Sequence, residues 1–515
     1  MSKGAPPGWV RDAVFYQIFP DRFARSGRVR PPGPMESWDS PPTVHGFKGG
    51  DLYGIIERLD HIESLGATAL YLNPIFASAS NHRFHTYDYL TVDPLLGGDE
   101  ALRALLDEAH RRGMRVVLDG VFNHAGRGFW PFHHVLETGR HSPYRDWFYL
   151  DPSVLVEDRQ LQAYPNRFLP GALPPDYGTT HREDPPSIET LGYQAWWNLP
   201  ALPKLNVANP EMRQYLLGVA EHWIRFGADG WRLDVAHEIE DLDFWAEFRQ
   251  RVRAVNSEAY TVAEIWFVAP EWLGPDLFDA TMNYPLAFAI LGFAAGSHLD
   301  RAVAAGHVGV RSGLLPLDGT GFAARVEELL AAYPAEHVAA QLNMLDSHDT
   351  PRALALCGEV EPSLRTALLL QMAMPGAPSI YYGNEIGMTG RADPDCRRAF
   401  PPDESDWNLD LLAFMRAAVA ARAADPALRG DGHRTLAVAG SAVAFERTDG
   451  AHRSVVAANA GEWPAELTLP GPLEAGSLVQ SLTSDLRSAQ VRSAEHGGVA
   501  VTLPARWGGI WRVLP

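Results

Sequence analysis

Eight short apolar runs, separated by segments with helical periodicity, constrain the fold of this 515-residue chain more than any other feature. Strands that alternate with helices are typical of parallel βαβ units. Eight consecutive units predict an α/β fold built on a closed (β/α)8 TIM barrel rather than on an open sheet. The strands are expected at Val14–Phe19, Ala69–Pro74, Arg115–Gly120, Gly230–Val235, Thr261–Trp266, Ala280–Pro285, Leu342–Asp349 and Ser379–Glu385.

The segments between these runs carry the signals of helix ends. Asp99 is expected to cap a helix that ends before Gly113. Asn209 is expected to cap a second helix, with Pro210 in its first turn and Gly227 at its end. Helices between successive strands are the usual crossovers of a parallel barrel, so these signals agree with the strand pattern.

Two parts of the chain interrupt this rhythm. Residues 125–195 are rich in Pro, aromatic and charged residues without a helical stripe, which predicts a lobe inserted after the third strand, beside the barrel mouth. After about residue 430 the pattern changes to short alternating strands, and Asp449-Gly450 predicts a hairpin there, so a C-terminal antiparallel β-sandwich is expected. The predicted division is barrel 1–124, inserted lobe 125–195, barrel 196–430 and β-sandwich 431–515.

Charge and composition argue against several classes of function. The 44 Lys+Arg and 63 Asp+Glu give a net charge of −19, which disfavours binding to nucleic acid or to an anionic membrane. The sequence contains no run of 18 apolar residues and no signal peptide, so we expect a cytoplasmic protein without a membrane partner.

Polar residues end several of the predicted strands. Arg232 and Asp234 are two positions apart, so both lie on one face of their strand, at the end where barrel active sites open. Glu264 and Trp266 share a face of the next strand in the same way. Taken alone, the first pair could equally be a structural ion pair, and the glutamate could cap a helix or pair with an arginine.

Two further strand ends add to this set. A single histidine there is more often a hydrogen-bonded structural residue than a catalytic one. Polar ends of four strands, however, converge on a small volume at the mouth of one barrel. These two ends present Asp119, Asn123 and His124 after the third strand, and His348, Asp349 and Arg352 after the seventh.

Clustered carboxylates suit two kinds of chemistry. Two of them about 5–5.5 Å apart fit retaining glycoside hydrolysis, in which one attacks the anomeric carbon and the other protonates the leaving oxygen. Several Asp and Glu side chains also suit a metal site. Here the acids alternate with Arg and His, whose positive charge repels a metal ion, so we predict no metal and favour glycoside hydrolysis.

The same segments resemble, in order, the conserved regions of the α-amylase family, glycoside hydrolase family 13. The likeness extends over most of residues 14–387. The matching segments are Gly-Gly-Asp-Leu (49–52), Asp-Gly-Val-Phe-Asn-His (119–124), Gly-Trp-Arg-Leu-Asp (230–234), Ala-Glu-Ile-Trp (263–266), Ser-His-Asp (347–349) and Tyr-Tyr-Gly-Asn-Glu (381–385).

The resemblance implies a role for each matching residue. Asp234 would be the nucleophile, Glu264 the general acid/base and Asp349 the stabiliser of the transition state. No cofactor is implied. The candidate substrate-binding residues at these strand ends are Asp119, His124, Arg232, His348 and Arg352.

Two details resemble the branch of cyclomaltodextrinases, neopullulanases and maltogenic amylases. They are Leu-Pro-Lys-Leu-Asn (202–206) and Val-Ala-His-Glu-Ile (235–239). The branch implies cleavage of α-1,4 bonds in maltooligosaccharides, cyclodextrins or starch, with some transglycosylation. His237 and Glu238 would then face the leaving-group sugars, and together with Trp266 they would bias the competition between water and sugar as acceptor.

The chain also departs from the pattern of its branch. Phe84 and His85 stand where relatives carry Tyr-Asp, so sugar contacts beyond the cleavage point are expected to differ. Residues 24–28 are basic where the branch often has calcium ligands, so calcium is not predicted. Because the first strand begins by Val14, the N-terminal β-domain that pairs subunits in the branch is expected to be missing, which favours a monomer or weak homo-oligomer with an open cleft.

Other reactions of the same family stay open. An α-glucosidase, a sucrose-cleaving enzyme and a trehalose-synthase-like isomerase would use the same three carboxylates. A non-catalytic, amylase-like partner subunit is disfavoured, because such proteins usually lack one or more of these acids. Exo and endo action both stay open, because the shape of the loops around the cleft decides between them.

Overall fold

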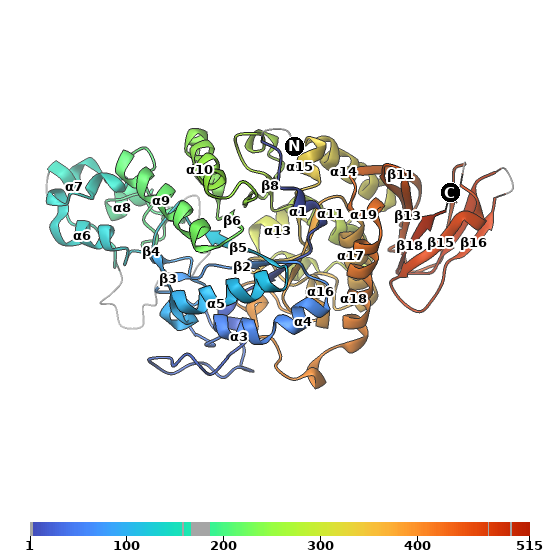
Figure 1. Ribbon diagram of the computed structural model, residues 1–515, viewed down its shortest axis with the longest axis horizontal. Coiled ribbons are helices and arrows are strands. Elements are labelled where there is room, and N and C mark those ends of the chain that lie inside the picture. Colours follow the sequence, from blue (N-terminus) through green and yellow to red (C-terminus); the bar gives the residue numbers. More distant parts are fainter. Residues whose placement is uncertain (1–3, 157–158, 166–185, 472, 495–496, 515) are drawn as a thin grey trace.

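An eight-stranded parallel barrel forms the centre of the computed structural model, which describes residues 4–156, 159–165, 186–471, 473–494 and 497–514 (Figure 1). The strand order is β8-β7-β6-β5-β2-β1-β10-β9, and a parallel bridge from Met282 to Leu342 joins the two end strands. Each predicted apolar run overlaps one strand, so the barrel prediction is confirmed. The strands are β1 (Phe15–Ile18), β2 (Ala69–Leu72), β5 (Arg115–Gly120), β6 (Gly230–Leu233), β7 (Tyr260–Ala263), β8 (Ala280–Thr281), β9 (Leu342–Asn343) and β10 (Ala377–Tyr381).

Alternation along β6 separates the core from the site. The indole N–H of Trp231 donates to the carbonyl of Ala220 in the surrounding helix α9 (Pro210–Phe226), at 3.3 Å. The next side chain, Arg232, points the other way and meets Asp119 of β5. Period-2 alternation therefore places the apolar face against the helices and the polar face in the barrel mouth, as the sequence predicts.

Helices pack around the barrel, and their ends follow local capping rules. Asn209 caps α9, since its side chain accepts from the amides of Glu211 and Met212. The predicted cap at Asp99 is wrong: Gly97 is the N-cap of α5, and Asp99 lies in the first turn. The surrounding helices are α3 (Leu52–Glu57), α4 (Leu59–Ser64), α5 (Gly98–Arg111), α9 (Pro210–Phe226), α10 (Leu242–Val255), α11 (Tyr284–Ala295), α14 (Gly319–Ala331), α17 (Glu361–Ala373) and α18 (Leu409–Ala424).

Short elements connect these pieces. A two-stranded antiparallel sheet of β3 and β4 follows the second barrel strand. The connecting elements are α1 (Gly8–Asp12), α2 (Pro20–Phe23), β3 (Phe76–Ser78), β4 (Thr86–Val92), α12 (Arg301–Ala304), α13 (Val308–Gly313), α15 (Ala335–Val338), α16 (Ala353–Leu356) and α19 (Pro426–Arg429).

The segment after β5 projects from one end of the molecule (Figure 1). It contains α6 (Trp130–Thr138), α7 (Pro152–Val156) and α8 (Ser187–Leu191). Antiparallel bridges join His124 to Lys204 and Phe148 to Leu205, so residues 203–205 lie along residues 123–125, just after β5. The predicted lobe 125–195 includes residues 157–158 and 166–185, which lie outside the described part of the chain, and its boundaries stay a prediction.

The C-terminal part forms two antiparallel sheets at the opposite end (Figure 1). The predicted hairpin is confirmed, because β12 and β13 pair up to Asp449 and His452 around Gly450. Trp507 and Trp511 are buried in the core of this part. The strands are β11 (Gly432–Ala439), β12 (Ala442–Asp449), β13 (His452–Asn459), β14 (Ala465–Leu469), β15 (Leu478–Thr483), β16 (Gln490–Ser493), β17 (Val499–Leu503) and β18 (Trp507–Val513).

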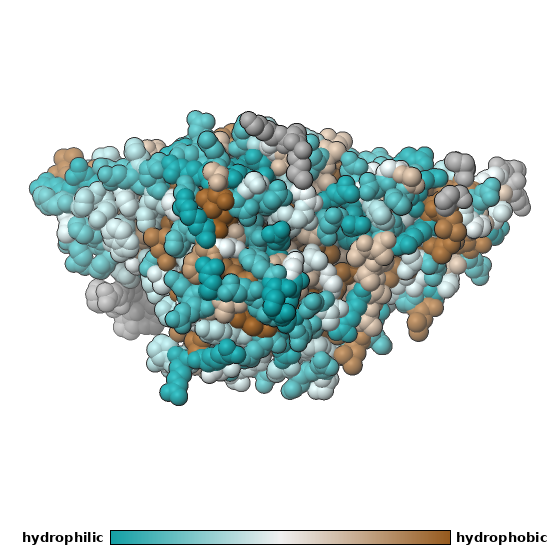
Figure 2. All heavy atoms as spheres, viewed as in Figure 1, coloured by the Kyte–Doolittle hydropathy of each residue, from teal (hydrophilic) through white to brown (hydrophobic). Residues whose placement is uncertain are grey.

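The surface carries the chain's many charged side chains. Figure 2 shows a mostly hydrophilic face on which hydrophobic side chains form small, separate groups. Within the described residues, no helix combines the length and the apolar character that crossing a bilayer requires.

Candidate active site

One buried arginine connects three carboxylates at the mouth of the barrel. Arg232 has no solvent exposure. Its Nη1 lies 2.8 Å from Asp119 Oδ1 and 3.1 Å from Asp234 Oδ1, and its Nη2 lies 3.0 Å from Glu264 Oε2. These acids come from the ends of three neighbouring strands, β5, β6 and β7. The structure therefore brings together the two predicted catalytic residues that the arginine contacts, and Asp119 beside them.

Glu264 is held by the backbone and by an indole. Its Oε2 accepts a hydrogen bond from the amide of Val235 at 2.8 Å, and its Oε1 accepts from Trp266 Nε1 at 3.0 Å. Val235 has a positive φ of 38°, which a β-branched residue adopts only under strain. Such strain is typical of functional sites, where the surrounding structure imposes an unusual backbone.

Asp234 is held in place through only one of its two carboxylate oxygens. Its side chain is about 8% exposed, and Oδ1 is engaged by Arg232. Its second oxygen, Oδ2, is buried and has no hydrogen-bond partner in the described part of the structure. A buried carboxylate oxygen without a partner is costly in a folded protein, so it indicates a group kept open for a ligand.

Asp349 joins the cluster from the chain that follows β9. Its Oδ2 lies 3.1 Å from His348 Nε2, and its Oδ1 lies 3.3 Å from Arg397 Nη2. Arg397 also donates to the carbonyl of His348 at 2.7 Å and pairs with Asp393 at 2.9 Å. Arg397 was missed by the sequence reasoning; the signal available was Asp-Pro-Asp-Cys-Arg-Arg (393–398) in the loop after the eighth strand.

The two histidines of the site are neutral donors. His348 Nδ1 lies 3.1 Å from the side-chain amide nitrogen of Gln17 and 3.0 Å from that of Asn73. Both amides donate, so we infer that the ring proton is on Nε2, toward Asp349. Burial lowers the pKa of His348 well below its usual value and that of His124 to about 3. Nε2 of each ring is buried and makes no hydrogen bond of standard geometry within the described residues, although His348 Nε2 lies 3.1 Å from Asp349 Oδ2.

Three aspartates of the cluster, Asp119, Asp234 and Asp349, hold protons more tightly than a free aspartate does. Burial raises the pKa of Asp349 to about 7 and that of Asp119 to about 6. Burial, then the neighbouring Glu264 carboxylate, raises the pKa of Asp234 well above its usual value, while Arg232 opposes the rise. Acids so close together cannot all be ionised at low cost, which favours a proton held within the cluster.

Two of the predicted contacts come from the loop before β4. The ring of Phe84 stacks on His348, with centroids 5.1 Å apart and planes at 6°. Phe84 therefore lies against the histidine that contacts Asp349. Burial lowers the pKa of His85 to about 3, so this residue is also neutral.

Three predicted residues lie after β6 and β7. His237 packs edge-on against Phe267 at 5.5 Å. The carbonyl of Glu238 accepts from Lys204 Nζ at 2.9 Å, which fixes the segment 202–206 beside it. Trp266 stacks on Tyr284 at 3.7 Å between centroids, and this stacking holds the indole that donates to Glu264.

The placement of Arg352 gives no support to its predicted contact with substrate. The side chain is fully buried and donates to the carbonyls of Cys396 and Tyr382. Its guanidinium also lies over the rings of Tyr381 and Tyr382. Arg352 thus holds the loop after β10 in place, and the cation beside Asp349 is Arg397.

The described residues offer little for a metal ion. Among them, no group of three or more His, Cys, Asp or Glu side chains is arranged to hold one. In the basic segment 24–28, Arg25 donates to the carbonyls of Lys48 and Glu36. The expectation of an enzyme without metal or cofactor stays a prediction.

Curated relatives align with most of the chain. A cyclomaltodextrinase of Geobacillus thermopakistaniensis is 38% identical over 97% of the chain, and a neopullulanase 2 of Thermoactinomyces vulgaris is 41% identical over 80% of it. The chain covers 76% of the first relative's length and 62% of the second's.

Solved structures match over nearly their whole length. A protein of Thermus thermophilus superposes with a TM-score of 0.85 and 45% identity over 98% of this chain and 100% of its own. The native debranching enzyme of Nostoc punctiforme superposes with a TM-score of 0.83 and 42% identity, over 98% of this chain and 99% of its own. A cyclic α-maltosyl-(1→6)-maltose hydrolase of Arthrobacter globiformis superposes with a TM-score of 0.79 and 36% identity, over 98% of this chain and 100% of its own.

The family itself follows from the catalytic domain. The model of the alpha-amylase catalytic domain matches residues 17–430, which contain the second half of β1, every later strand of the barrel and the whole carboxylate cluster. The chain therefore belongs to the α-amylase family of glycoside hydrolases, family 13.

Proposed function

We propose that the protein is a retaining α-glucan hydrolase that cleaves α-1,4-glucosidic bonds in maltooligosaccharides, cyclodextrins or starch, with some transglycosylation. The observation that carries the proposal is the open Oδ2 of Asp234 beside Glu264, with both acids held on one guanidinium. Paired carboxylates of this kind fit a double displacement at the anomeric carbon.

The first step forms a covalent intermediate. Asp234 Oδ2 attacks the anomeric carbon and forms an ester bond, while the bond from that carbon to the glycosidic oxygen breaks. Glu264 gives its proton to the departing oxygen. The amide of Val235 and the indole of Trp266 fix the orientation of Glu264 for this transfer.

The second step releases the sugar. Glu264, now ionised, takes a proton from a water molecule, whose oxygen attacks the anomeric carbon and breaks the ester bond to Asp234. A sugar hydroxyl in place of water gives transglycosylation. His237 and Glu238 are proposed to face that acceptor sugar.

The remaining residues hold the sugar at the cleavage point. His124 Nδ1 faces the side-chain amide nitrogen of Asn123 at 3.3 Å, which places its ring proton on Nε2 as in His348. Both Nε2 atoms lack a protein acceptor of standard geometry among the described residues, so they suit sugar hydroxyls. Asp349 supplies negative charge against the oxocarbenium-like transition state. Phe84 stacks on His348, the histidine proposed to bind this sugar, and is itself proposed to pack against the sugar ring.

A product time course tests the proposal. The purified protein is incubated separately with β-cyclodextrin, soluble starch, pullulan, maltotriose, sucrose and trehalose, and the products are separated. We expect cyclodextrin and maltooligosaccharides to yield maltose and glucose with retained anomeric configuration. Turnover of sucrose or trehalose alone would replace the proposal by one of the disaccharide reactions of the family, and inertness toward all six would refute it.

A second candidate is cleavage of α-1,6 bonds. It is favoured by the solved structures that match this chain end to end, among them a debranching enzyme and a hydrolase of a (1→6)-linked cyclic maltose dimer. Comparing kcat/KM for cyclic α-maltosyl-(1→6)-maltose and for β-cyclodextrin separates the two. A higher value for the (1→6)-linked ring would make this candidate the main activity.

We also propose a cytoplasmic location and a monomer or weak homo-oligomer. One relative, 37% identical over 83% of the chain, is named an intracellular maltogenic amylase of Bacillus subtilis. Cell fractionation tests the location, and sedimentation velocity over a range of protein concentrations tests the assembly.

A further inference from the structure

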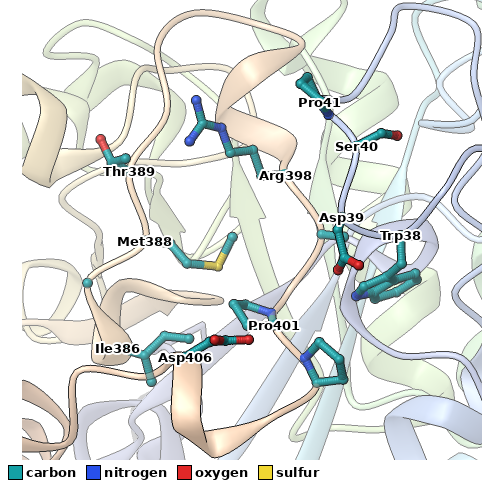
Figure 3. A pocket seen from close by; sticks show the side chains of 13 residues that line it. Trp38, Asp39, Ser40, Pro41, Ile386, Met388, Thr389, Arg398, Pro401 and Asp406 are labelled. Carbon is teal, nitrogen blue, oxygen red and sulfur yellow. The ribbon is translucent and has the colours of Figure 1, made fainter.

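A cavity lies outside the catalytic cluster, between two loops at the mouth of the barrel (Figure 3). Its volume is about 570 Å³, which is within the range of sites for small organic ligands. One wall comes from the loop between α2 and α3, and the other from the loop between β10 and α18. The lining residues that matter here are Trp38, Asp39, Met388, Arg398, Pro401 and Asp406.

One hydrogen bond between the walls, and two more that hold the β10–α18 loop, fix the shape of the cavity. Trp38 Nε1 donates to the carbonyl of Phe400 at 2.8 Å and so joins the two loops directly. Arg58 donates to the carbonyl of Pro402 at 2.7 Å, and Trp407 donates to that of Pro401 at 3.0 Å. A cavity with fixed walls binds a ligand without an ordering cost.

The charges in the cavity select against anions. Asp39 and Asp406 are exposed, and neither carboxylate has a hydrogen-bond or ion-pair partner in the described part of the chain. Arg398 is already paired with Asp395: its Nε donates to Oδ1 at 2.7 Å, and its Nη2 donates to Oδ2 at 3.1 Å. The local balance is therefore negative, which disfavours a phosphate or carboxylate ligand.

The apolar groups and the carboxylates that line the cavity are together suited to a sugar ligand. Figure 3 shows Met388, Pro401 and Asp406 of one loop facing Trp38 and Asp39 of the other. The apolar groups can pack against the C–H face of a pyranose ring, and the two free carboxylates can accept hydrogen bonds from its hydroxyls. A neutral ligand rich in hydroxyls satisfies both features at once.

We propose that this cavity is a second α-glucan-binding site, which holds one stretch of a long substrate while another stretch is cleaved. The choice of glucan among neutral sugars rests on the proposed function. The same loop serves both places: Arg398 lines the cavity, and its neighbour Arg397 contacts Asp349 in the catalytic cluster.

Affinity electrophoresis in native gels containing soluble starch tests the proposal. All proteins carry Glu264→Gln, so that the gel is not digested. The test variant adds Asp39→Ala and Asp406→Ala; the matched control adds Asp403→Ala and Glu404→Ala, exposed acids of the same loop that do not line the cavity. We expect the dissociation constant for starch to rise at least about tenfold in the test variant and to stay unchanged in the control.

A second readout separates this proposal from the proposed function. With Glu264 intact, 4-nitrophenyl α-maltoside is short enough to fill the catalytic cleft alone, and we expect the test variant to hydrolyse it within twofold of the parent. Starch affinity equal to that of the control, or no retardation of the parent, would overturn the cavity site. A further outcome is retardation in the gel that depends on the cavity acids, while the protein with Glu264 intact hydrolyses neither starch nor 4-nitrophenyl α-maltoside. That result would support the cavity site and overturn the proposed function.

Discussion

At the scale of the residue, the site depends on how Arg232 divides its nitrogens. Nη1 contacts Asp119 and Asp234, and Nη2 contacts Glu264, so a single buried cation partly offsets the repulsion among three acids. The division leaves Asp234 Oδ2 without a protein partner in the described residues. A buried acid that is oriented through one oxygen and open at the other is suited to attack a carbon placed against it.

The two acids proposed for the double displacement are expected to be individually essential. Glu264→Gln keeps the shape of the side chain but removes its proton transfer, so kcat/KM should fall by about 10²–10⁴-fold. Asp234→Asn should cost at least as much, because the covalent intermediate cannot form. Asp243→Asn, an exposed acid at the start of α10, serves as the control and should leave activity unchanged.

Steady-state kinetics on a maltooligosaccharide measures these changes, and thermal unfolding reports whether the fold is kept. Turnover near the parent value in either active-site variant would refute the mechanism.

Arg397 is expected to set the acid limb of the pH profile. Burial raises the pKa of Asp349 to about 7, and the Arg397 cation works against that rise. Arg397→Gln removes the opposing charge, so the pKa of Asp349 rises further. If the ionised acid stabilises the transition state, the low-pH limb of kcat/KM should move to higher pH, by about one unit.

The profile of kcat/KM against pH measures the shift. Arg391→Gln, an exposed arginine of the same loop, is the control. An unmoved limb in Arg397→Gln would show that Asp349 does not govern activity in this range.

Residue patterns predicted the site where a strand sets the geometry, and not where a loop does. Period 2 along β6 was enough to place Arg232 and Asp234 together. Arg352 and Arg397 follow strands β9 and β10 in loops whose course depends on tertiary contacts. Local spacing therefore favoured the arginine nearer in sequence to Asp349, whereas the loop after β10 brings Arg397 to it.

At the scale of the element, capping rules predict the start of a helix correctly where a single residue determines it. Asn209 satisfies two amides of α9, as an N-cap asparagine does. Asp99 has the same chemistry, but Gly97 adopts a φ of 102° and starts α5 two residues earlier. The glycine was the better signal, because only it adopts that backbone without strain.

The cap of α9 gives a prediction about stability. Asn209→Ala leaves the amides of Glu211 and Met212 without their acceptor, so the free energy of unfolding should fall by about 1 kcal/mol. Asn209→Asp keeps an acceptor at the same place and should be nearly neutral. Chemical denaturation measures both, and equal losses in the two variants would show that the cap does not stabilise the helix.

At the scale of the whole molecule, the eight-strand rhythm was sufficient to predict the barrel, and the change after about residue 430 predicted the C-terminal sheets. The way these parts join was not predictable, because it uses side chains far apart in sequence. Arg447 of β12 and Arg422 of α18 both reach the C-terminal end of α17, where they donate to main-chain carbonyls. Helix ends leave carbonyls unpaired, so this end offers acceptors to both parts of the molecule.

This junction is expected to hold the C-terminal part on the barrel. Arg447 is fully buried and donates to the carbonyls of Ala373, Leu428, Gly430 and Gly432, so Arg447→Leu leaves several buried acceptors unpaired. The loss should be about 3 kcal/mol or more in the free energy of unfolding. Arg434→Leu, which removes a mostly exposed partner of Glu446, should cost less than about 1 kcal/mol. Differential scanning calorimetry compares them, and similar melting temperatures for the two variants would show that the carbonyl cluster contributes no more than a surface ion pair.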